Sequence, residues 1–421
     1  MNSAAAALRA QIDDIDKCLA ALESQMTALR AQKKQLLKDL GSITYPVLTL
    51  PNEITVEILH FVPLMLRRYQ NGPQPYGSLL RLASVCQTWR AVTLSTCTLW
   101  NDNVKVICDN IRDAGQLLAA CLPRAGSLPL DLYIHLPKDD SSMGAILSTL
   151  SLYSSQWRRV HLSSSYGYKK TNFIQLPLDL PPSTFPLLEH LELFSFSIPY
   201  LLAVLPHAVN LRCLQLGRAS SPEYAQVAPL STLLPHLHTF ICTHDPPAMV
   251  LQYLTLPALE SLRLTHLSDA GVHVVLSCVA RSSSTIRTLE LTSMTFPATY
   301  NCLRSLSTIT HLDLSCGWAN DEEKEFFAAM ISVGFLPALE SLTCNDCWPE
   351  SAESLVAVVS ARWRGVKGTI KLISASLDFG DQDGDYDQDD DYDPLSYSRA
   401  LRKLDQLGRE GLKLVLTGAK I

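Results

Sequence analysis

The chain has 421 residues, which at about 150 residues per domain predicts two or three domains. Hydrophobic residues make up 47% and charged residues 18%, below the roughly 25% usual for soluble domains, and this composition excludes a disordered chain. The net charge of −6 comes from nine Asp between Asp378 and Asp393, without which the chain carries +3. A nearly neutral body offers no electrostatic basis for binding nucleic acid.

Neither membrane insertion nor secretion is expected. Apolar runs are interrupted by polar residues or Pro before the ~18–20 residues needed to span a bilayer, and no apolar secretory segment follows Met1. The 12 Cys lack the spacing of a disulfide framework, which favours thiols in a reducing compartment. We therefore expect a soluble intracellular protein, located in the cytoplasm, the nucleus or both.

The first forty residues follow a heptad pattern. Apolar residues alternate at gaps of four and three, at Leu8, Ile12, Ile15, Leu19, Leu22, Met26, Leu29, Leu36 and Leu40. Lys33 occupies the one seam position that is not apolar. This strict alternation predicts a coiled-coil helix over residues 1–42, with self-association as one outcome, and Lys33 would favour a particular partner or register. The alternative is an amphipathic helix packed on its own domain.

A leucine-rich pattern follows between about Leu128 and Cys344. The motif LxxLxL recurs, with substitutions, around central residues 160, 191, 214, 240, 262, 289, 312 and 342. Its spacings lie at or slightly above the 20–29 residues of leucine-rich repeats. Short helices are expected between copies, over 200–205, 271–280 and 322–332. The pattern predicts an α/β fold in which residues 106–365 form an irregular leucine-rich-repeat-like solenoid.

Two features depart from a standard repeat. The ninth motif position, usually Asn or Cys, is here Phe196, Ala219, Asp245, Leu267, Met294, Gly317 and Cys347, so no asparagine ladder is expected. After Trp363, strands are expected over 368–377 and 411–416, with a helix over 394–407, and residues 366–421 would cap the solenoid. The acidic run 378–393 is expected to be a solvated loop. The alternative is a Leu-rich α+β domain without true repeats.

The most specific motif lies between the heptad helix and the repeats, in residues 43–105. Leu50-Pro51-Asn52-Glu53-Ile54 opens a predicted helix, because Pro suits the first helical position and Glu the first turn. The apolar stripe of this helix consists of Ile54, Ile58, Leu59 and Val62. A second predicted helix carries a stripe of Leu82, Val85, Trp89 and Val92. Short helices cannot bury so many large side chains, so a partner surface is implied.

This segment resembles an F-box. The resemblance rests on the order LPxEI…IL…VCxxWR…LW, carried by Leu50-Pro51-x-Glu53-Ile54, Ile58-Leu59, Val85-Cys86-x-x-Trp89-Arg90 and Leu99-Trp100. It covers roughly residues 46–103, with a spacer over 63–78 that is longer than in most F-boxes. A heptad helix, an F-box and a leucine-rich region in this order are also similar to a large family of F-box proteins of mushroom-forming fungi. The alternative is an ordinary three-helix subdomain.

The resemblance implies an adaptor role in ubiquitin-dependent degradation. F-box proteins dock on the Skp adaptor, which joins them to a cullin and a ubiquitin-charged conjugating enzyme, while the downstream repeats hold a protein substrate. The matching positions would form or support the docking surface: Leu50, Pro51, Ile54, Ile58, Val85, Cys86 and Trp89. Catalysis would belong to the partners, so neither enzymatic activity nor a cofactor is expected.

Sites for chemistry are weak in the sequence. Cys344-x-x-Cys347 is a single pair, which is more typical of a repeat strand than of a zinc site. Asp381, Asp383 and Asp385 match the first ligands of a calcium loop, but Tyr386 and Tyr392 stand where such a loop needs Gly and Glu. Phosphate-binding glycine loops and GxSxG elbows are absent from the sequence. We expect no metal site.

A substrate face is expected on the inner side of the solenoid. Side chains alternate along a strand, so the two neighbours of each central residue point away from the core. The charged, imidazole or amide side chains in these rows are His190, Glu192, Gln215, Arg263, Glu290, His311 and Asp313. The predicted rows are mildly charged and contain no aromatic cluster. Our hypothesis is a protein substrate held here; the alternative is a solvated face without a ligand.

Three functions compete on this evidence. The leading hypothesis is the substrate-recognition subunit of a Skp–cullin–F-box ubiquitin ligase. The second is a scaffold that binds the Skp adaptor without a cullin. The third is a repeat-protein interaction module whose F-box match is coincidental. The first two share every sequence feature and differ in cullin recruitment, whereas the third predicts no adaptor binding.

Overall fold

The computed structural model describes fifteen stretches of the chain, separated by gaps: residues 2–42, 49–66, 75–101, 104–108, 113–137, 140–164, 185–194, 196–219, 231–243, 248–315, 320–332, 334–347, 351–365, 369–379 and 394–417. Most of the predicted acidic loop, residues 380–393, and residues 67–74 of the spacer lie outside these stretches. Among the described helices, none combines the length and apolarity needed to cross a bilayer.

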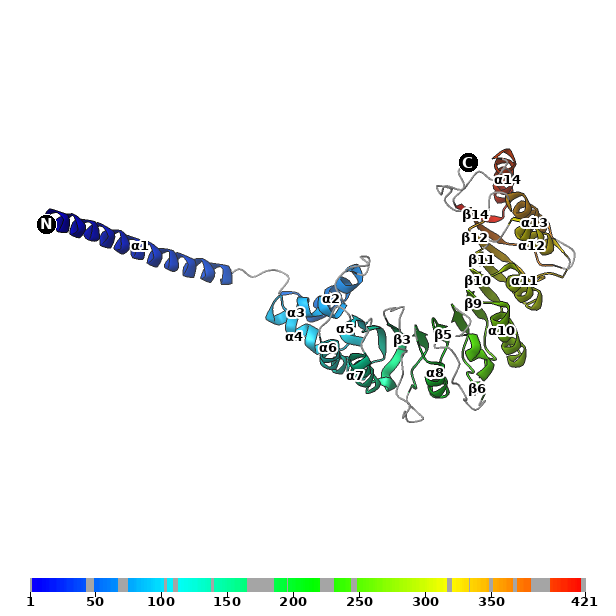
Figure 1. Ribbon diagram of the computed structural model, residues 1–421, viewed down its shortest axis with the longest axis horizontal. Coiled ribbons are helices and arrows are strands. Elements are labelled where there is room, and N and C mark those ends of the chain that lie inside the picture. The colour runs from blue at the N-terminus through cyan, green and yellow to red at the C-terminus, as the bar shows by residue number, and fades with distance from the viewer. Residues whose placement is uncertain are drawn as a thin grey trace.

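The N-terminal part of the chain is helical (Figure 1). The predicted heptad segment is one helix, α1 (Asn2–Ser42). Four short helices follow: α2 (Asn52–Leu66), α3 (Pro75–Ala83), α4 (Gln87–Ser95) and α5 (Thr98–Asn101). Every described side chain of α1 is exposed, so this helix is not packed on its own domain.

The remainder is built on a twelve-stranded sheet in which every pair of neighbouring strands is parallel. Its strands follow chain order: β1 (Val104–Ile107), β2 (Leu130–Leu136), β3 (Trp157–Ser164), β4 (His190–Leu193), β5 (Cys213–Leu216), β7 (Thr239–Cys242), β9 (Ser261–Thr265), β10 (Thr288–Thr292), β11 (His311–Ser315), β12 (Ser341–Asn345), β13 (Ser374–Asp378) and β14 (Lys413–Thr417). A separate two-stranded pair consists of β6 (Thr232–Leu233) and β8 (Leu254–Thr255).

Helices join successive strands and cover one face of the sheet (Figure 1). They are α6 (Ala114–Cys121), α7 (Asp140–Ser151), α8 (Ile198–Val204), α10 (Asp269–Ser282), α11 (Phe296–Ser305), α12 (Asn320–Ile331), α13 (Ala352–Arg364) and α14 (Pro394–Arg409). Short 3-10 helices add η3 (Leu122–Ala125), η4 (Ser154–Gln156), η5 (Leu205–His207) and η6 (Met249–Tyr253). The ribbon curves, with the helices on its outer side and the strands lining its inner side.

Strand pairing confirms the register predicted from the leucine motif. The central residues pair in order across the sheet: Val160, Leu191, Leu214, Phe240, Leu262, Leu289, Leu312 and Leu342. Each is at most 2% exposed. Burying one such side chain contributes about 1.5–3 kcal/mol, so each residue of this apolar column helps to stabilise the sheet.

Turns after the strands replace the missing asparagine ladder. His266, Ser293 and Asp346 directly follow β9, β10 and β12, and all three have positive φ, between 51° and 54°. This left-handed residue turns the chain so that the next side chain, at the ninth motif position, enters the core: Leu267, Met294 and Cys347 are at most 5% exposed. The ninth position is therefore a packing position in these copies.

Three expectations need correction or extension. The second helix predicted through Leu82, Val85 and Trp89 is two helices, because the chain turns at Val85 and Cys86 between α3 and α4. The sheet begins earlier than predicted, with β1 spanning the boundary placed at 105/106. At the other end, β13 and β14 continue the sheet in register, and the strand predicted over 368–377 covers only Ser374–Asp378.

Candidate partner-binding surfaces

The four short helices pack through the inward residues of the motif. Thr55 and Leu59 on α2 are at most 3% exposed, and the amide and hydroxyl of Thr55 both donate to the carbonyl of Pro51, which anchors the helix start. Leu79 on α3 and Val92 on α4 are buried against them. These residues hold the helices together and are not available to a partner.

The outward faces of the same helices keep large apolar side chains in solvent. Ile54 and Phe61 lie two turns apart on one face of α2 and are 48% and 58% exposed. Leu80 on α3 is 42% exposed and Val85, in the turn before α4, is 63% exposed. Phe61 and Leu80 were not among the predicted docking residues. The position of Phe61 follows from Ile54, seven residues earlier on the same helix, whereas Leu80 belongs to another helix and no such spacing pointed to it.

The turn between α3 and α4 explains the exposure of Val85. The Ser84 hydroxyl donates to the carbonyl of Arg81, which ends α3, and Cys86 is extended, with φ −155° and ψ 171°. Cys86 Sγ then accepts a hydrogen bond from the amide of Trp89 and caps α4. The predicted docking residues Leu50, Ile58, Cys86 and Trp89 are half-buried, whereas Pro51, Ile54 and Val85 are exposed.

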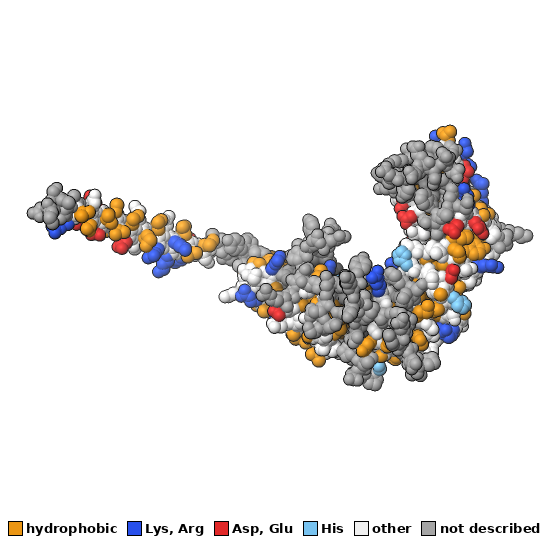
Figure 2. Space-filling view, in the orientation of Figure 1, with side chains coloured by type: hydrophobic (Ala, Val, Ile, Leu, Met, Phe, Trp, Pro, Cys, Tyr) orange, Lys and Arg blue, Asp and Glu red, His pale blue; other side chains and the backbone are white. Residues whose placement is uncertain are grey.

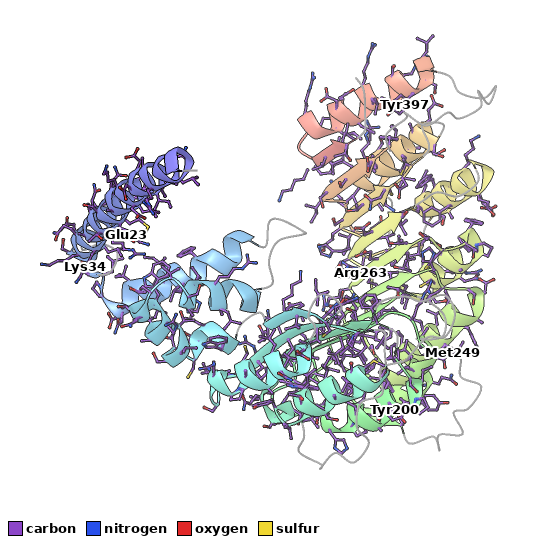
Figure 3. All side chains as sticks on the ribbon, turned by 60° about the vertical axis from the view of Figure 1, so that its left-hand side comes forward. Glu23, Lys34, Tyr200, Met249, Arg263 and Tyr397 are labelled. Carbon is purple, nitrogen blue, oxygen red and sulfur yellow. The ribbon has the colours of Figure 1, made fainter. Side chains whose placement is uncertain are left out.

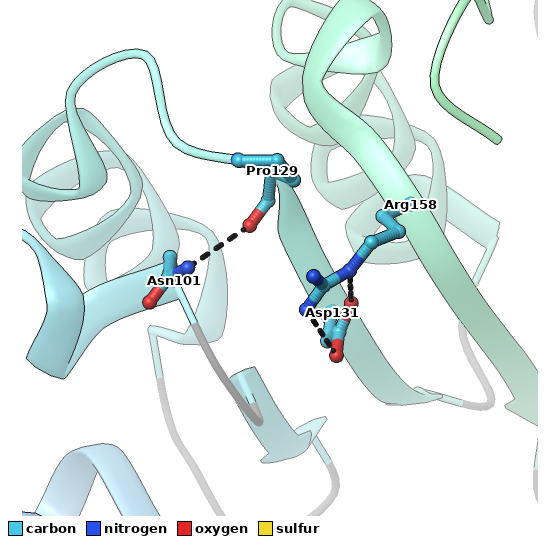
Figure 4. Close-up of polar contacts among 4 residues, drawn as sticks. All are labelled: Asn101, Pro129, Asp131 and Arg158. Carbon is cyan, nitrogen blue, oxygen red and sulfur yellow. Dashed lines mark hydrogen bonds and ion pairs between the residues drawn. The ribbon is translucent and has the colours of Figure 1, made fainter. Parts of the chain in front are cut away.

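The end of the motif, Leu99-Trp100, lies in the core that the helices share with the sheet. Trp100 is fully buried; its indole nitrogen donates to the carbonyl of Thr93 at 2.7 Å, and the Arg124 guanidinium lies 5.6 Å from the ring centre. Asn101 donates to the carbonyl of Pro129 at 3.3 Å (Figure 4). The short helices are therefore fixed to the first strands by a continuous core.

An ion pair reinforces the sheet beside this junction. Arg158 Nε and a second guanidinium nitrogen lie 2.9 Å from the two carboxylate oxygens of Asp131 (Figure 4). Asp131 is 6% exposed, so this bidentate pair is largely shielded from solvent. The ion pair joins β2 to Arg158, the second residue of β3. At this point the strand pairing skips one residue, because Leu130 pairs with Trp157 and Asp131 with Arg159.

Comparison with known families identifies this helical segment. The family model described as F-box-like matches residues 47–104. The chain therefore contains an F-box-like domain, a class that in general binds a Skp-type adaptor and is itself non-catalytic. No curated protein matches the chain.

The predicted substrate-face residues lie in two rows on the inner face of the sheet. One row joins His190 and His311 through the strands between them, and the other joins Glu192, Gln215, Arg263, Glu290 and Asp313. All seven are exposed or half-buried. Figure 3 shows Arg263 on the strand side, away from Tyr200 and Met249 on the outer side.

Charged residues in the second row form a connected polar group. Arg263 Nε lies 2.5 Å from Glu290 Oε2, and Asn345 Nδ2 donates to Asp313 Oδ1 at 2.8 Å. Burial, followed by the neighbouring Glu290 charge, raises the pKa of Asp313, while Arg263 and the Asn345 hydrogen bond act in the opposite direction. The side chain of Asp313 therefore lies in surroundings that disfavour its negative charge.

An aromatic cluster that the predicted rows did not include lies nearer the F-box-like domain. Tyr133 on β2 stacks on His161 of β3 at 5.8 Å between ring centres, and Phe194, directly after β4, lies 5.7 Å from the same imidazole. His161 Nδ1 lies 2.6 Å from Glu192. Strand register places Tyr133 and His161 in the Glu192 row. Extending the motif to a copy at Leu132 would have placed Tyr133 and His161 in this row, whereas Phe194 lies beyond the end of its strand and no motif position indicates it.

Burial makes two thiols of the described chain unreactive, and metal-binding side chains do not gather in it. Burial raises the pKa of the Cys121 thiol to about 11 and that of Cys302 to about 12, which keeps both protonated. Cys344 on β12 and Cys347, two residues after that strand, are at most 2% exposed. Among the described residues, no group of three or more His, Cys, Asp or Glu is arranged to hold a metal ion.

Proposed function

We propose that this protein is the substrate-recognition subunit of a Skp–cullin–F-box ubiquitin ligase. The F-box-like domain would dock on the Skp adaptor and through it on a cullin, and the inner face of the sheet would hold a protein substrate for ubiquitin-dependent degradation. Such a subunit would act in the cytoplasm or the nucleus and contribute no catalytic residue.

One observation carries this proposal: the F-box-like helices separate into an inward set that holds them and an outward set that remains exposed. Leu59, Leu99 and Trp100 are buried, whereas Ile54 and Val85 keep 48% and 63% of their surface in solvent. Exposed apolar side chains on rigid short helices are the anchors that helix-in-groove interfaces use. The docking set we propose is Leu50, Pro51, Ile54, Ile58, Val85, Cys86 and Trp89, with Phe61 and Leu80 added.

The sheet and its outer helices are, in this proposal, an irregular leucine-rich-repeat solenoid over residues 106–365, capped by residues 366–421. The in-register column of central residues and the single helical face support it. The order of heptad helix, F-box-like domain and this sheet also supports an origin in the expanded F-box family of mushroom-forming fungi.

For the substrate, the aromatic cluster Tyr133–His161–Phe194 supplies the anchor and the polar group around Arg263 supplies specificity. Tyrosine and other aromatic side chains contribute large contact areas at binding hot spots. Both groups lie on the inner face of the sheet, whose first strands share a core with the F-box-like domain, so this core would hold the substrate face and the docked adaptor in one assembly.

Adaptor docking is tested by co-purifying the full chain with a Skp adaptor and a cullin. Ile54→Asp places a charge on the docking face and should weaken adaptor binding by about 30-fold or more. The matched control is Leu152→Asp, which changes an apolar side chain that is 79% exposed after α7 and should leave binding unchanged. A Leu50→Ala/Pro51→Ala double variant tests the start of the motif.

The partners recovered separate the competing functions. Recovery of both partners with wild type, lost in Ile54→Asp, supports the ligase subunit. Recovery of the adaptor without a cullin favours the scaffold. Failure of wild type to bind the adaptor would refute the proposal and leave the repeat-protein interaction module.

A further inference from the structure

Helix α1 carries a continuous exposed apolar stripe. Its nine apolar seam residues, from Leu8 to Leu40, each keep 49–64% of their surface in solvent. Figure 2 shows hydrophobic side chains along this helix, which Figure 1 shows extended away from the sheet. Polar contacts of its described side chains, such as Lys17 with Asp14 and Gln35 with Asp39, stay within the helix. A heptad stripe of this length indicates a helical partner.

We propose that the partner is α1 of a second copy of this chain, bound in the antiparallel direction. The proposal concerns the assembly of the protein and does not depend on the function of the F-box-like domain. Three observations on α1 support the second copy and its direction: the charge of the two helix halves, the position of Lys33, and the pairing of the seam residues.

The two halves of α1 carry opposite net charge. Residues 8–23 have a net charge of −2, from Asp13, Asp14, Asp16 and Glu23 against Arg9 and Lys17. Residues 24–42 have a net charge of +3, from Arg30, Lys33, Lys34 and Lys38 against Asp39. A parallel pair places like halves side by side, whereas an antiparallel pair places each acidic half beside a basic half. Electrostatic attraction therefore selects the antiparallel direction.

Lys33 selects the same direction. The alternating gaps put Lys33 at an a position, which in a parallel pair faces the same residue of the other copy. Two ammonium groups would then oppose each other inside an apolar seam. In the antiparallel pair with full overlap, Lys33 faces Ile15 of the second copy, next to Asp16. Its long side chain can bury its stem on the isoleucine and reach that carboxylate.

One antiparallel register uses the whole stripe. Its facing layers are Leu8 with Leu40, Ile12 with Leu36, Ile15 with Lys33, Leu19 with Leu29, and Leu22 with Met26. At the flanking e positions Asp16 meets Arg30 twice, and a single like-charge contact joins Glu23 to Glu23 at the exposed centre. A shift of one heptad in one direction places like charges side by side, Arg9 beside Arg30 and Asp16 beside Glu23. A shift in the other direction leaves Leu8 and Ile12 without a facing residue. Full overlap is therefore the preferred register.

Self-association is tested on the full chain by sedimentation velocity over a concentration series. Wild type should be a dimer. The double variant Leu19→Asp/Leu29→Asp places two facing carboxylates in each of the two symmetric Leu19–Leu29 layers, and it should weaken the dimer by about 100-fold or more. The matched control Ala31→Asp lies on the outer side of the helix and should remain dimeric. Unchanged thermal unfolding of the sheet in all three proteins shows that only the helix pairing is altered.

The direction is tested with a short bis-maleimide cross-linker and the native Cys18, an exposed g-position thiol. In the antiparallel pair Cys18 lies opposite Gln32, so Gln32→Cys should form cross-linked dimers, and Gln32→Cys/Cys18→Ser should lose them. A parallel pair would instead bring together the d positions, so Leu29→Cys/Cys18→Ser would cross-link. A monomeric wild type across the concentration series, or cross-linking of the Leu29 variant alone, would overturn the proposal.

Discussion

The ring of Phe194 occupies the space in which Gly217 would carry a side chain. A β-carbon built on Gly217 would lie 2.2 Å from Phe194 Cδ1, far inside van der Waals contact. Gly217 follows β5 in the same way that Phe194 follows β4, so the two residues are neighbours at the ends of paired strands. The glycine thus leaves room for the phenyl ring beside the backbone at Gly217, where the ring completes the aromatic cluster with His161.

Replacing this glycine should displace the ring. We expect Gly217→Ala to cost about 1–2 kcal/mol of unfolding free energy, because the half-buried ring must rotate away from the new methyl group. In a Phe194→Ala background the same change should be neutral or slightly stabilising, since the space is then empty. Chemical denaturation of the four proteins measures this cycle. Equal effects of Gly217→Ala in both backgrounds would contradict the steric relationship.

A buried arginine clamps the chain between α12 and β12. Arg362 on α13 is 1% exposed; its Nε donates to the carbonyl of Met330 at 2.9 Å, and its other nitrogens donate to the carbonyls of Leu336 and Phe335. Arg362→Ala leaves these carbonyls without that donor, and we expect a loss of about 3 kcal/mol or more in thermal or denaturant unfolding. The exposed neighbour Arg364 provides the control, whose change to Ala should stay within about 0.5 kcal/mol.

The stability of the sheet should fall in mildly acidic solution through His190. Burial, followed by the positive charge of Arg159, lowers the pKa of His190 below its ordinary value of 6.5. The unfolded chain therefore binds a proton at higher pH than the folded chain, and unfolding free energy is lost as the pH falls below 6.5 toward the folded pKa. His190→Gln should reduce this acid sensitivity, measured by denaturation across that window. An equal reduction in the exposed His236→Gln would count against the assignment.

Asp313 should show the opposite pH dependence, because its charged form is also the one that the folded chain disfavours but appears at high rather than low pH. Its raised pKa means that the folded chain releases this proton less readily, so its contribution to stability decreases as the pH rises through the folded pKa. Asp313→Asn removes the disfavoured charge and keeps an oxygen to accept from Asn345, so we expect slightly higher stability at neutral pH. If the inner face holds substrate, the same variant should capture less of it. A fall in neutral-pH stability would contradict the electrostatic account.

Periodicity determined the local structure that the sequence predicts best. Gaps of four and three residues produce an apolar stripe on a helix, and α1 is such a helix; the LxxLxL spacing places one central residue per strand, and those residues pair in register. Such patterns succeed because side-chain direction repeats with the backbone over a few residues. The same reasoning failed at Val85, where a helical spacing continues across a turn made by the side chains of Ser84 and Cys86.

Only the tertiary structure decided which side chains meet. Tyr133, His161 and Phe194 form a cluster although about thirty residues separate each from the next, because parallel pairing brings successive strands side by side. The division of the F-box-like motif into a buried set and an exposed set depends likewise on packing against the sheet, where Trp100 shares the core with η3 and the first strands. Sequence spacing determines the face on which a side chain lies, whereas packing determines whether that face is covered.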